Sequence, residues 1–586
     1  MKHLAVVLSL LLASAAGASP PLGDLTIASS RVPDWYLPPD PPDTSGWTVT
    51  NVNAANCDGS SGTNDRTAIQ AAIDAATPPA VIQLQGSVGS TCIYNIRSSA
   101  VLIDRSQIVI KGGGMAYTNL KLYPSTGKVS LTSSTADGTP TNWTAGYTRG
   151  TTTVTVASTT GIVAGDWILL QSAFPAELGV GNACNPGVNS AVHIAIEKVS
   201  SVNGGASQIT FDHGLRDDYS NAATCQQTVA ELHPISQSGI EGMTITATSP
   251  ENAGWEFNSP TNITNVVESW VRDVKYVGGT SSTATTSGIN RFIKLNTVAR
   301  VLLDKIWLAE IHYWNYDEGA IDFNPKSYES AVINSIMEGT HVDTRIMGGV
   351  QGIIWAYNFS RCTPATGTGS CAERSVFFHG LANETLVEGN DLEVSTQHDN
   401  HWGSEAYRNT LYRNRVSTNP AGRKAGYNKD SNIVGISSFC EIGGNPLAPD
   451  MNLMLNVASR FRNDGNGVFD CVTSGVGNNY WIERNLVEGS LVLTPAADTH
   501  NVSNVTSATT TSGVGDWSTK TFPASLVYSS KPSWWLSAPW PAIGADVDVI
   551  GSGMHKLPAQ CRYEDSVTGD CAPYSSARYT RVKRNP

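Results

Sequence analysis

Two histidines beside glycines, His379 and His401, stand one short repeat apart in this chain of 586 residues. His379 lies in a Phe-Phe-His-Gly run and His401 in His-Trp-Gly. A step in the low twenties is typical of one coil of a parallel β-solenoid, so we expect both imidazoles on adjacent coils, facing the same way. Acid and base groups on neighbouring coils can flank one glycosidic bond of an extended polymer. The alternative is that both histidines only satisfy hydrogen bonds in turns.

Acidic and basic residues at matching places in the repeat complete a candidate catalytic set. Its members are His379, His401, Glu441, Asp470, Asp322 and Arg408. Hydrolysis needs two carboxyl groups that flank the bond. β-Elimination from a uronate needs a base at the sugar C5 proton, and an arginine, an asparagine or a calcium ion near the sugar carboxylate. The histidines and arginines favour elimination, but the residues leave both reactions open.

Two polar clusters and one aromatic group supply candidates for substrate binding. The cluster at 340–345 contains an arginine that can pair with a sugar carboxylate, and the cluster at 397–408 is expected in a protruding loop, where binding residues concentrate. The aromatic group at 307–316 can stack on sugar rings, or it can belong to the core. The predicted substrate-binding residues are Arg345, His341, Asp343, Trp402, Glu405 and Trp314.

A metal site is a further hypothesis. His398 and Asp399 lie close to His401 in the sequence and carry metal-binding side chains. Their spacing is not that of tight metal ligands, so the pattern favours no particular metal. Calcium is the ion that an elimination reaction would use, and the sequence indicates no other cofactor.

The scaffold that must position these side chains is indicated by a recurring asparagine. Apolar residues, two or three polar residues, an Asn and another apolar residue recur in the segments 385–394, 410–419 and 480–489. The recurrence comprises Asn390, Asn414 and Asn485, with looser copies at Asp273, Asp304, Asn334, Asn358 and Asn456. Asn suits a sharp turn, because its side chain bonds nearby backbone and it tolerates left-handed dihedral angles. Short strands and such turns predict an all-β fold, a parallel β-helix with stacked asparagines.

The segment 62–76 predicts a short amphipathic helix. Asn64, Asp65 or Thr67 can cap it, and Ile69 and Ile73 share one face. The open end of a solenoid must be covered, and a short amphipathic helix can cover it. We therefore expect this helix to be an N-terminal cap.

The capping segment resembles a known family. Asp65, Thr67 and the run Ala-Ile-Gln-Ala-Ala-Ile-Asp-Ala at 68–75, followed by a strand and by Tyr-Asn-Ile at 94–96, resemble the N-terminal cap of right-handed β-helix proteins of the pectate lyase superfamily. The resemblance implies a right-handed parallel β-helix and a secreted carbohydrate-active enzyme, without identifying a subfamily. The superfamily contains both lyases and hydrolases.

The chain also departs from that superfamily. Asn64 stands where a second Asp is frequent, and Leu84-Gln85-Gly86 stands where a Pro-x-Gly usually follows the strand. The Asn-x-Asp, Asp-Asp and Gly-His-Gly series of polygalacturonases is missing, and so is the Asp-Pro-His motif of mannuronan epimerases. These departures make the polygalacturonase branch less favoured.

We expect five parts along the chain. Alternating apolar residues in 124–232 break the solenoid rhythm and predict antiparallel hairpins. Clustered tryptophans near the C-terminus are expected to pack in a cap rather than to stack on sugars. The expected parts are a signal peptide (1–18), an N-terminal arm with the capping helix and first coils (19–123), an inserted antiparallel β-subdomain (124–232), the main β-helix (233–495) and a C-terminal cap (496–586).

The segment 1–18, with Lys2, an apolar run and an Ala-Gly-Ala cleavage site, is typical of a secretory signal. We therefore expect a secreted protein, extracellular or periplasmic, that is monomeric and has no membrane segment. Ten cysteines in an oxidising compartment predict disulfides. Pairing of neighbours gives Cys57–Cys92, Cys184–Cys225, Cys362–Cys371, Cys440–Cys471 and Cys561–Cys571.

The formal net charge of −12 argues against nucleic-acid binding through a general positive field. An acidic polymer would need a local basic cluster or a bound cation. The predicted partner is a polysaccharide, and the predicted function is a secreted polysaccharide-degrading enzyme, with a lyase favoured over a glycoside hydrolase. A non-catalytic glycan-binding or adhesin β-solenoid is the alternative from another class.

Overall fold

The structure is a computed structural model, and it describes most of the first two thirds of the chain and shorter stretches beyond. The described residues are 22–60, 62–123, 128–173, 192–219, 227–247, 261–278, 291–309, 319–340, 342–361, 374–379, 382–392, 396–399, 408–416, 434–436, 450–454, 456–458, 461–462, 479–483, 486–487, 491–492, 500–502, 505–506, 520–535, 538–547 and 555–564.

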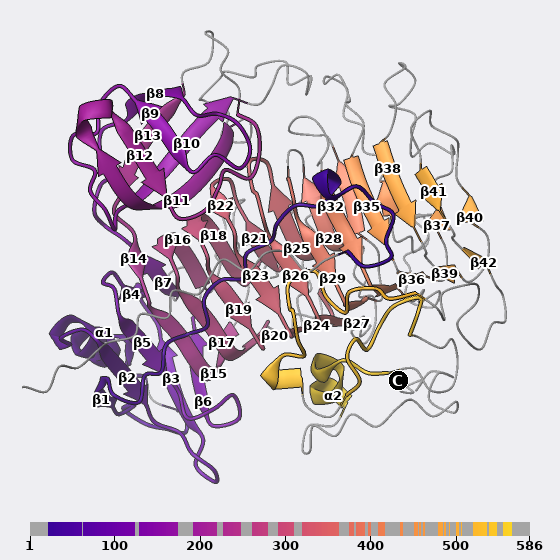
Figure 1. Ribbon diagram of the computed structural model, residues 1–586. Helices are drawn as coiled ribbons and strands as arrows, with labels where there is room; N and C mark the ends of the chain where they lie inside the picture. Colours follow the sequence, from indigo (N-terminus) through magenta and orange to yellow (C-terminus); the bar gives the residue numbers. More distant parts are fainter. Residues whose placement is uncertain are drawn as a thin grey trace, which may run out of the picture.

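The main body is a β-helix of parallel strands, as predicted (Figure 1). One long sheet of 23 strands bends into two strips, and a second sheet of 11 strands lies beside it. Strip 1 contains β1 (Thr48–Val52), β2 (Ala80–Leu84), β5 (Ile108–Lys111), the first halves of β15 (Gly239–Ala247) and β17 (Trp270–Val277), β19 (Leu302–Asp304), β23 (Ala331–Ile333), β26 (Ile354–Ala356), β29 (Leu386–Glu388), β32 (Asn409–Tyr412), β35 (Asp450–Met454), β38 (Asn479–Glu483) and β41 (His500–Val502).

Strip 2 follows strip 1 in each coil. It contains β3 (Cys92–Ile96), β6 (Thr118–Leu122), the second halves of β15 and β17, β20 (Trp307–Ala309), β24 (Ile336–Glu338), β27 (Phe359–Arg361), β30 (Asp391–Leu392), β33 (Arg415–Val416), β36 (Val457–Ala458), β39 (Leu486–Val487) and β42 (Val505–Thr506).

The second sheet precedes strip 1 in each coil. It contains β4 (Ala100–Ile103), β7 (Lys128–Thr132), β14 (Ile235–Ser236), β16 (Thr261–Val267), β18 (Ile293–Ala299), β21 (Ile321–Phe323), β22 (Ser327–Tyr328), β25 (Val342–Met347), β28 (Arg374–His379), β31 (Thr396–Asp399) and β34 (Val434–Ile436). A separate pair is formed by β37 (Phe461–Arg462) and β40 (Leu491–Val492).

The interior of the β-helix is filled by apolar side chains that stack from coil to coil. One such column in strip 1 is continuous over six coils, and all its members are at most 1% exposed: Val271, Leu303, Val332, Trp355, Val387 and Leu411. Burial of apolar surface stabilises a fold by about 25 cal/mol per Å². Because each coil contacts only its neighbours, this core extends from coil to coil as far as Leu411 in the described residues, rather than forming one centre.

The predicted asparagine ladder is confirmed for four positions: Asn358, Asn390, Asn414 and Asn456. All four are buried. The backbone N–H of Asn358 donates to Asn390 Oδ1 at 2.8 Å, that of Asn390 to Asn414 Oδ1 at 3.1 Å, and that of Asn414 to Asn456 Oδ1 at 2.9 Å. Each side-chain amide also donates to a backbone carbonyl of the preceding coil. The ladder therefore satisfies the turn backbone of one coil with the side chain of the next.

The earlier part of the predicted ladder is wrong by one or two positions. Ser335, not Asn334, continues the stack, because its N–H donates to Asn358 Oδ1 at 2.9 Å. Asn334 and Asp273 occupy the preceding position, which has a positive φ in the described coils, and Asp304 lies one position earlier still. Asn485 lies outside the described residues. Two consecutive residues thus supply the left-handed conformation and the stacked side chain, whereas one asparagine was expected to supply both.

The N-terminal end of the β-helix carries the predicted capping helix, α1 (Arg66–Ala75). Its buried Ile69 and Ile73 join the interior of the β-helix. Asp65 is the N-cap, but its carboxylate accepts N–H bonds from Ala55 and Asn95, both at 2.7 Å, and not from the helix. Asp65 therefore fixes the helix to two neighbouring segments.

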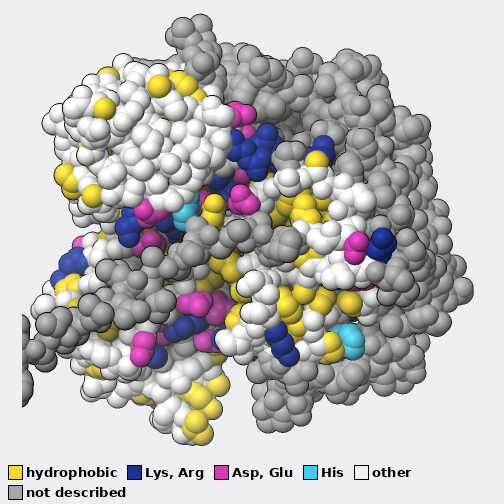
Figure 2. Space-filling view, in the orientation of Figure 1, with side chains coloured by type: hydrophobic (Ala, Val, Ile, Leu, Met, Phe, Trp, Pro, Cys, Tyr) yellow, Lys and Arg dark blue, Asp and Glu magenta, His cyan; other side chains and the backbone are white. Residues whose placement is uncertain are grey.

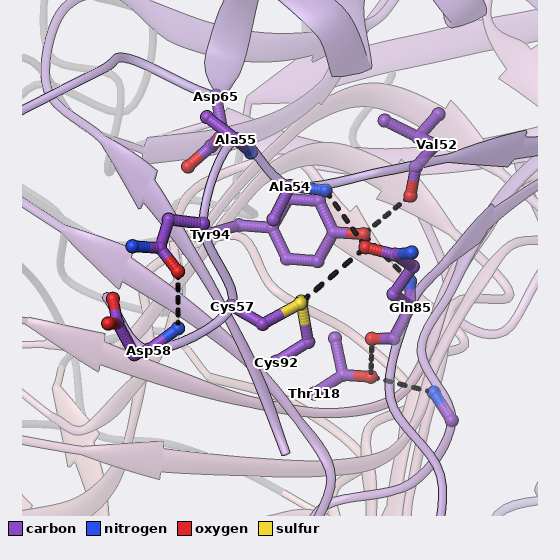
Figure 3. The surroundings of a disulfide bond; sticks show 12 residues. Val52, Ala54, Ala55, Cys57, Asp58, Asp65, Gln85, Cys92, Tyr94 and Thr118 are labelled. Carbon is purple, nitrogen blue, oxygen red and sulfur yellow. Dashed lines mark hydrogen bonds between the residues drawn. A yellow bond between two sulfur atoms is a disulfide. The ribbon is translucent and has the colours of Figure 1, made fainter. Parts of the chain in front are cut away.

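The predicted disulfide Cys57–Cys92 is confirmed and lies beside this cap, with an S–S distance of 2.06 Å. Figure 3 shows Tyr94 next to it, with its hydroxyl between Val52 and Gln85. The hydroxyl donates to Val52 O at 2.5 Å and accepts the N–H of Gln85 at 2.7 Å. Each of the other four predicted pairs includes a cysteine outside the described residues, so these pairs stay predictions.

Six antiparallel strands form a closed barrel beside the β-helix, at the upper left of Figure 1. They are β8 (Thr141–Ala145), β9 (Thr153–Val156), β10 (Trp167–Ala173), β11 (Val192–Asn203), β12 (Gln208–Phe211) and β13 (Thr228–Leu232), with the short helix η4 (Gly204–Ala206) between β11 and β12. The strand β7, within the expected insertion, pairs in parallel with β4 and β16 and belongs to the β-helix. The barrel packs its apolar interior against Val267, Ala299 and Tyr328 of the β-helix.

Described segments from the N-terminal and C-terminal regions of the chain cover the outer face of strip 1. The N-terminal arm, with η1 (Ser29–Arg31), contributes Trp35, and the C-terminal segment, with η7 (Ser533–Trp535) and α2 (Pro558–Glu564), contributes Trp535. Trp535 is fully buried, so packing rather than sugar stacking is confirmed for this residue. Arg413 anchors the C-terminal segment through Asp546, with Nη2 and Oδ2 2.9 Å apart. The described part of this segment thus lies along the flank of the β-helix.

Replacing one member of the ladder should destabilise the protein. Asn414→Ala removes the acceptor of the Asn390 N–H and the donor to Val387 O, both buried. We expect a loss of about 1–3 kcal/mol for each group left unsatisfied, measured by denaturant unfolding. Asn142→Ala, at an exposed position of β8, is the matched control and should change stability little. Equal stability of both variants would contradict the ladder's role.

Candidate functional site

The outer side of the second sheet carries a buried ion cluster around Asp322. Arg345 Nε and Nη2 each donate to one oxygen of Asp322 at 2.6 Å, and Arg291 Nη1 donates to Oδ2, also at 2.6 Å. Asp322 is in register with Lys294 on one side and with Arg345 on the other. Two residues that the sequence analysis named separately, Asp322 and Arg345, thus lie on adjacent strands of one sheet, together with Lys294, and Arg291 joins them.

Asp322 is suited to hold two arginines rather than to give a proton. Both of its oxygens accept charge-assisted hydrogen bonds, and its side chain is 0% exposed. A general acid must present a proton to the leaving oxygen. Asp322 instead fixes the guanidinium groups of Arg291 and Arg345 at the outer side of the sheet.

Asp343 lies next to this cluster along β25 and is also fully buried. Its carboxylate accepts a hydrogen bond from the hydroxyl of Thr340. Because the sequence places Asp343 two positions before Arg345, both side chains belong to the same side of the strand. Asp343 is therefore part of the buried surroundings of the cluster.

The strand register brings His379 opposite Asp399. Met347, His379 and Asp399 follow one another on β25, β28 and β31. The position paired with His379 on the next coil is therefore that of Asp399, and not that of His401 as the sequence argument expected. Asp322 is in register with Phe377, two positions before His379. Asp322 and His379 therefore lie two positions apart along the strand direction, and not in the single column that was predicted.

Several predicted site residues lie in parts of the chain that the structure leaves undescribed. They are His401, Glu441, Asp470, His341, Trp402, Glu405 and Trp314, and for His379, His398 and Asp399 the structure gives the strand position alone. Their catalytic, binding and metal-binding roles stay predictions. Within the described ranges, no group of three or more His, Cys, Asp or Glu side chains is arranged to hold a metal ion.

A second charged cluster, which the sequence did not predict, lies where the barrel meets the β-helix. The turn between the second sheet and strip 1 has a residue with positive φ in each of seven coils: Gln237, Glu268, Arg300, Glu329, Gly352, Glu384 and Arg408. The strand and bridge register stacks these residues in one line. Figure 2 shows Lys, Arg, Asp, Glu and His side chains gathered beneath the barrel.

Charges of opposite sign alternate along this line, which we call the charge ladder. Its members are Glu268, Arg300, Glu329, Arg216, Glu384 and Arg408. Five belong to the β-helix turns, and Arg216 comes from the barrel. Arg216 Nη1 lies 3.3 Å from Glu329 Oε1, and its Nε lies 3.0 Å from Glu384 Oε2. The coil between those of Glu329 and Glu384 has Gly352 at this turn position, so Arg216 supplies the positive charge there.

Gly352 is required at that coil for two reasons. Its φ of +68° is in the left-handed region, and a Cβ atom would lie 2.8 Å from Nε of Arg216. The absence of a side chain makes room for the guanidinium of the barrel. Arg216 of the barrel therefore joins the two parts, because it occupies the space that a side chain at position 352 of the β-helix would fill.

The barrel adds two carboxyl groups and two histidines to the charge ladder. Glu197 contacts Arg300 at 3.3 Å and accepts a hydrogen bond from the Tyr328 hydroxyl at 2.9 Å. Asp217 contacts Arg408 at 2.8 Å and His193 at 3.4 Å. His213 contacts Glu329 at 3.3 Å and stacks on Tyr36 of the N-terminal arm, with ring centroids 4.1 Å apart.

Burial sets the ionisation of these groups. It raises the pKa of Glu197 well above its usual value, with the neighbouring Glu329 adding to the effect. Burial would also raise the pKa of Glu329, but the hydrogen bond from His213 and the charges of Arg300 and Arg216 lower it to about 2. Burial lowers the pKa of His193 to about 3. The carboxyl groups of this interface therefore differ widely in proton affinity.

Arg408 belongs to the charge ladder, since its guanidinium contacts Asp217 and, at 3.5 Å, Glu384. Its predicted catalytic role stays a prediction. A sequence signal for the charge ladder exists in retrospect, because Glu268, Glu329 and Glu384 each precede a Ser or Thr, and Arg408 precedes an Asn. Because the coils differ in length, these residues do not recur at a fixed spacing in the sequence.

Comparison with known proteins gives a distant structural likeness only. No family model matches the chain, and no curated protein matches it. One similar solved structure is the Gp54 tailspike of Acinetobacter baumannii bacteriophage AP22 in complex with A. baumannii capsular saccharide, with a TM-score of 0.45 and 10% identity over 76% of this chain and 73% of that chain. A second is the tailspike gp61 of Pseudomonas phage phi297, with a TM-score of 0.44 and 12% identity over 76% of this chain and 69% of that chain. A third is the Streptococcus pneumoniae surface adhesin PfbA, with a TM-score of 0.36 and 10% identity over 78% of this chain and 91% of that chain. These likenesses are too distant to assign a function to this chain.

The membership of the pectate lyase superfamily likewise remains a resemblance, drawn from the N-terminal cap. No helix within the described ranges combines the length and the apolar character that a membrane crossing needs. The functional evidence therefore comes from the residues of the chain itself.

Removal of the Asp322 carboxylate should be costly. Asp322→Asn takes away the charge that two buried guanidinium groups share, so we expect a loss of about 3–5 kcal/mol in the free energy of unfolding. Asp212→Asn, at an exposed position of the barrel, is the control and should unfold like the original protein. A stable Asp322→Asn variant would show that the cluster does not hold this sheet together.

Gly352→Ala tests the contact between barrel and β-helix. The change combines backbone strain with a clash against Arg216, whereas Gly150→Ala, at φ +79° with no atom within 4 Å of the new Cβ, introduces strain alone. We expect each alanine to cost about 1–3 kcal/mol for strain, and Gly352→Ala to cost more in urea unfolding because of the clash. Equal losses in both variants would argue against the role of Arg216.

Proposed function

We propose that the protein is a secreted enzyme that binds an extended polysaccharide along the second sheet and cleaves it by β-elimination. The observation that supports the proposal is the row of charged side chains on successive strands, Lys294, Asp322 and Arg345, on the sheet that also carries His379. Neighbouring strands lie about 4.8 Å apart, so a polymer along the axis would pass one strand after another, and the buried Asp322 would hold Arg345 in place beneath it.

The arrangement around Asp322 favours elimination over hydrolysis. Hydrolysis needs a pair of carboxyl groups, one of which gives a proton. Asp322, one of the candidates for that role, has both oxygens bound by Arg291 and Arg345. Elimination instead needs a base, for which His379 and His401 are the candidates, and a cationic group near the sugar carboxylate. Arginines held at fixed positions are suited to the second requirement.

The remaining predicted residues take supporting roles in this proposal. Glu405, Trp402 and His341 would contact the sugar chain, and a calcium ion near His398 and Asp399 would be an alternative means of neutralising the uronate carboxylate. Glu441 and Asp470 would matter if the reaction were hydrolysis. Each role can be tested by single substitution once a substrate is found.

The reaction can be identified by its products. The purified protein is incubated with a panel of acidic and neutral polysaccharides, and both ultraviolet absorbance and reducing ends are followed. β-Elimination yields an unsaturated uronate that absorbs in the ultraviolet, so a rise in absorbance supports the proposal. New reducing ends without absorbance would identify a hydrolase. Binding without either product would identify a glycan-binding protein and overturn the proposal.

Two histidine variants test the proposed base. His401→Ala and His379→Ala should each lower kcat, by about 10²–10⁴-fold for the residue that removes the proton, while the melting temperature stays near that of the original protein. His233→Ala is the matched control, because His233 is partly exposed on the barrel and pairs with Glu231. Turnover that is unchanged in both variants would exclude the two histidines as the base.

A further inference from the structure

Among the described residues, the interface between the barrel and the β-helix holds more buried carboxyl groups than buried guanidinium groups. Four carboxyl groups at this interface are at most 4% exposed: Glu197, Asp217, Glu329 and Glu384. Three guanidinium groups face them, on Arg216, Arg300 and Arg408. The fifth acid, Glu268, is 18% exposed and has Lys198 at 3.7 Å. Apart from the pair Glu268–Lys198, the buried interface therefore has one carboxyl group more than it has guanidinium groups, and the imidazole of His213 lies 3.3 Å from Glu329.

Glu197 and Asp217 stand at the two ends of this alternating series of opposite charges. Glu197 shares the guanidinium of Arg300 with Glu329, at 3.3 and 3.2 Å, and Asp217 shares that of Arg408 with Glu384, at 2.8 and 3.5 Å. The side chain of Arg408 is 24% exposed and that of Arg300 is 8% exposed, so Glu197 is at the more buried end. Its second contact is the hydroxyl of Tyr328, a neutral group. An ionised carboxylate at this buried place would face Glu329 across one guanidinium, and an uncompensated buried charge is costly.

We propose that Glu197 makes the attachment of the barrel to the β-helix dependent on a proton. The barrel is held firmly while Glu197 is protonated, and its attachment weakens when Glu197 loses the proton. The proposal does not depend on the enzymatic function. It concerns how firmly the barrel is attached beside the second sheet, whatever the protein binds there.

The charged and titratable groups around Glu197 all come from described elements. On the β-helix these are Arg300, Glu329 and Tyr328, and Tyr36 approaches from the N-terminal arm. On the barrel they are Arg216, Tyr219 and His213, the last of which contacts both Arg300 and Glu329. Arg300 and Arg216 lower the pKa of Glu197, whereas burial and Glu329 raise it, and burial has the largest effect. Burial raises the pKa of all three tyrosines, so these stay neutral where the carboxyl group titrates.

The sign of the dependence follows from the direction of the shift. A group with a raised pKa in the attached state stabilises that state fully below its ordinary pKa, about 4.3 for Glu, and loses this effect as the pH rises through the raised value. Burial raises the pKa of Asp217 and of Glu384 as well, which adds in the same direction. The lowered pKa values of Glu329 and His193 act oppositely, as the pH falls from the ordinary value of each group toward about 2 for Glu329 and about 3 for His193.

Hydrogen exchange of the full chain tests the proposal. The hydrogen exchange of the amides in β10 and β11, whose apolar side chains form one cluster with Val267, Ala299 and Tyr328 of the β-helix, is followed as a function of pH. The rates are corrected for the pH dependence of exchange in an unfolded chain. One linked proton changes the attachment equilibrium by about tenfold per pH unit between the two pKa values of Glu197. We expect barrel protection to fall with rising pH in the original protein, and this fall to be reduced in Glu197→Gln.

The control is Glu268→Gln, which changes an acid of the same charge ladder that is partly exposed and paired with Lys198. Its pH dependence should match that of the original protein. A Glu197→Gln variant with an unchanged dependence would overturn the proposal. Should that variant fail to fold, the original protein still decides, because barrel protection that is independent of pH would also overturn it.

Discussion

The structure depends on the stacking of turns in register. No coil of the β-helix can satisfy its own backbone, so the N–H of one turn is bonded by a side chain of the following coil, as Asn390 does for Asn358. In the described coils, the residue before the stacked side chain has a positive φ, which turns the chain sharply enough for the next strand to align. Residues 24 to 42 positions apart thereby become neighbours about 4.8 Å apart.

The same stacking dictates which charges can occupy the outer turns. Like charges on adjacent coils would repel one another where solvent screening is weak, so the line of turn residues beside the barrel has to alternate in sign. Glu268, Arg300 and Glu329 alternate by sequence alone. The next coil offers no charge of its own, and Arg216 of the barrel completes the order. The attachment of the barrel is thus a consequence of how the β-helix repeats.

Much of the fold could be predicted from the sequence, because strands and turns leave local patterns. The stacked asparagines from Asn358 to Asn456 and the barrel strands follow from such patterns, whereas the pair Cys57–Cys92 came from the simple assumption that neighbouring cysteines pair. Register is harder, because a shift of one position leaves the pattern intact. Asn334 and Ser335 both suit a turn, and only the partner on the next coil shows which one stacks.

The candidate site was less predictable for the same reason. The spacing of His379 and His401 matches one coil of a typical β-helix, but the coil at this place is shorter and brings Asp399 opposite His379. The ion cluster at Asp322 needs Arg291, which stands near the start of a different coil. The charge ladder joins residues from two parts of the fold, and no local pattern relates Arg216 to Gly352.

The contact of Arg216 with Gly352 limits which substitutions this chain can accept during evolution. The insertion that forms the barrel and the glycine that receives its arginine constrain each other. A lineage that lost the barrel would keep a coil in which Glu329 and Glu384 face each other across a gap, and selection would favour a cationic side chain at that coil. A lineage that kept the barrel would tolerate almost no residue but glycine there.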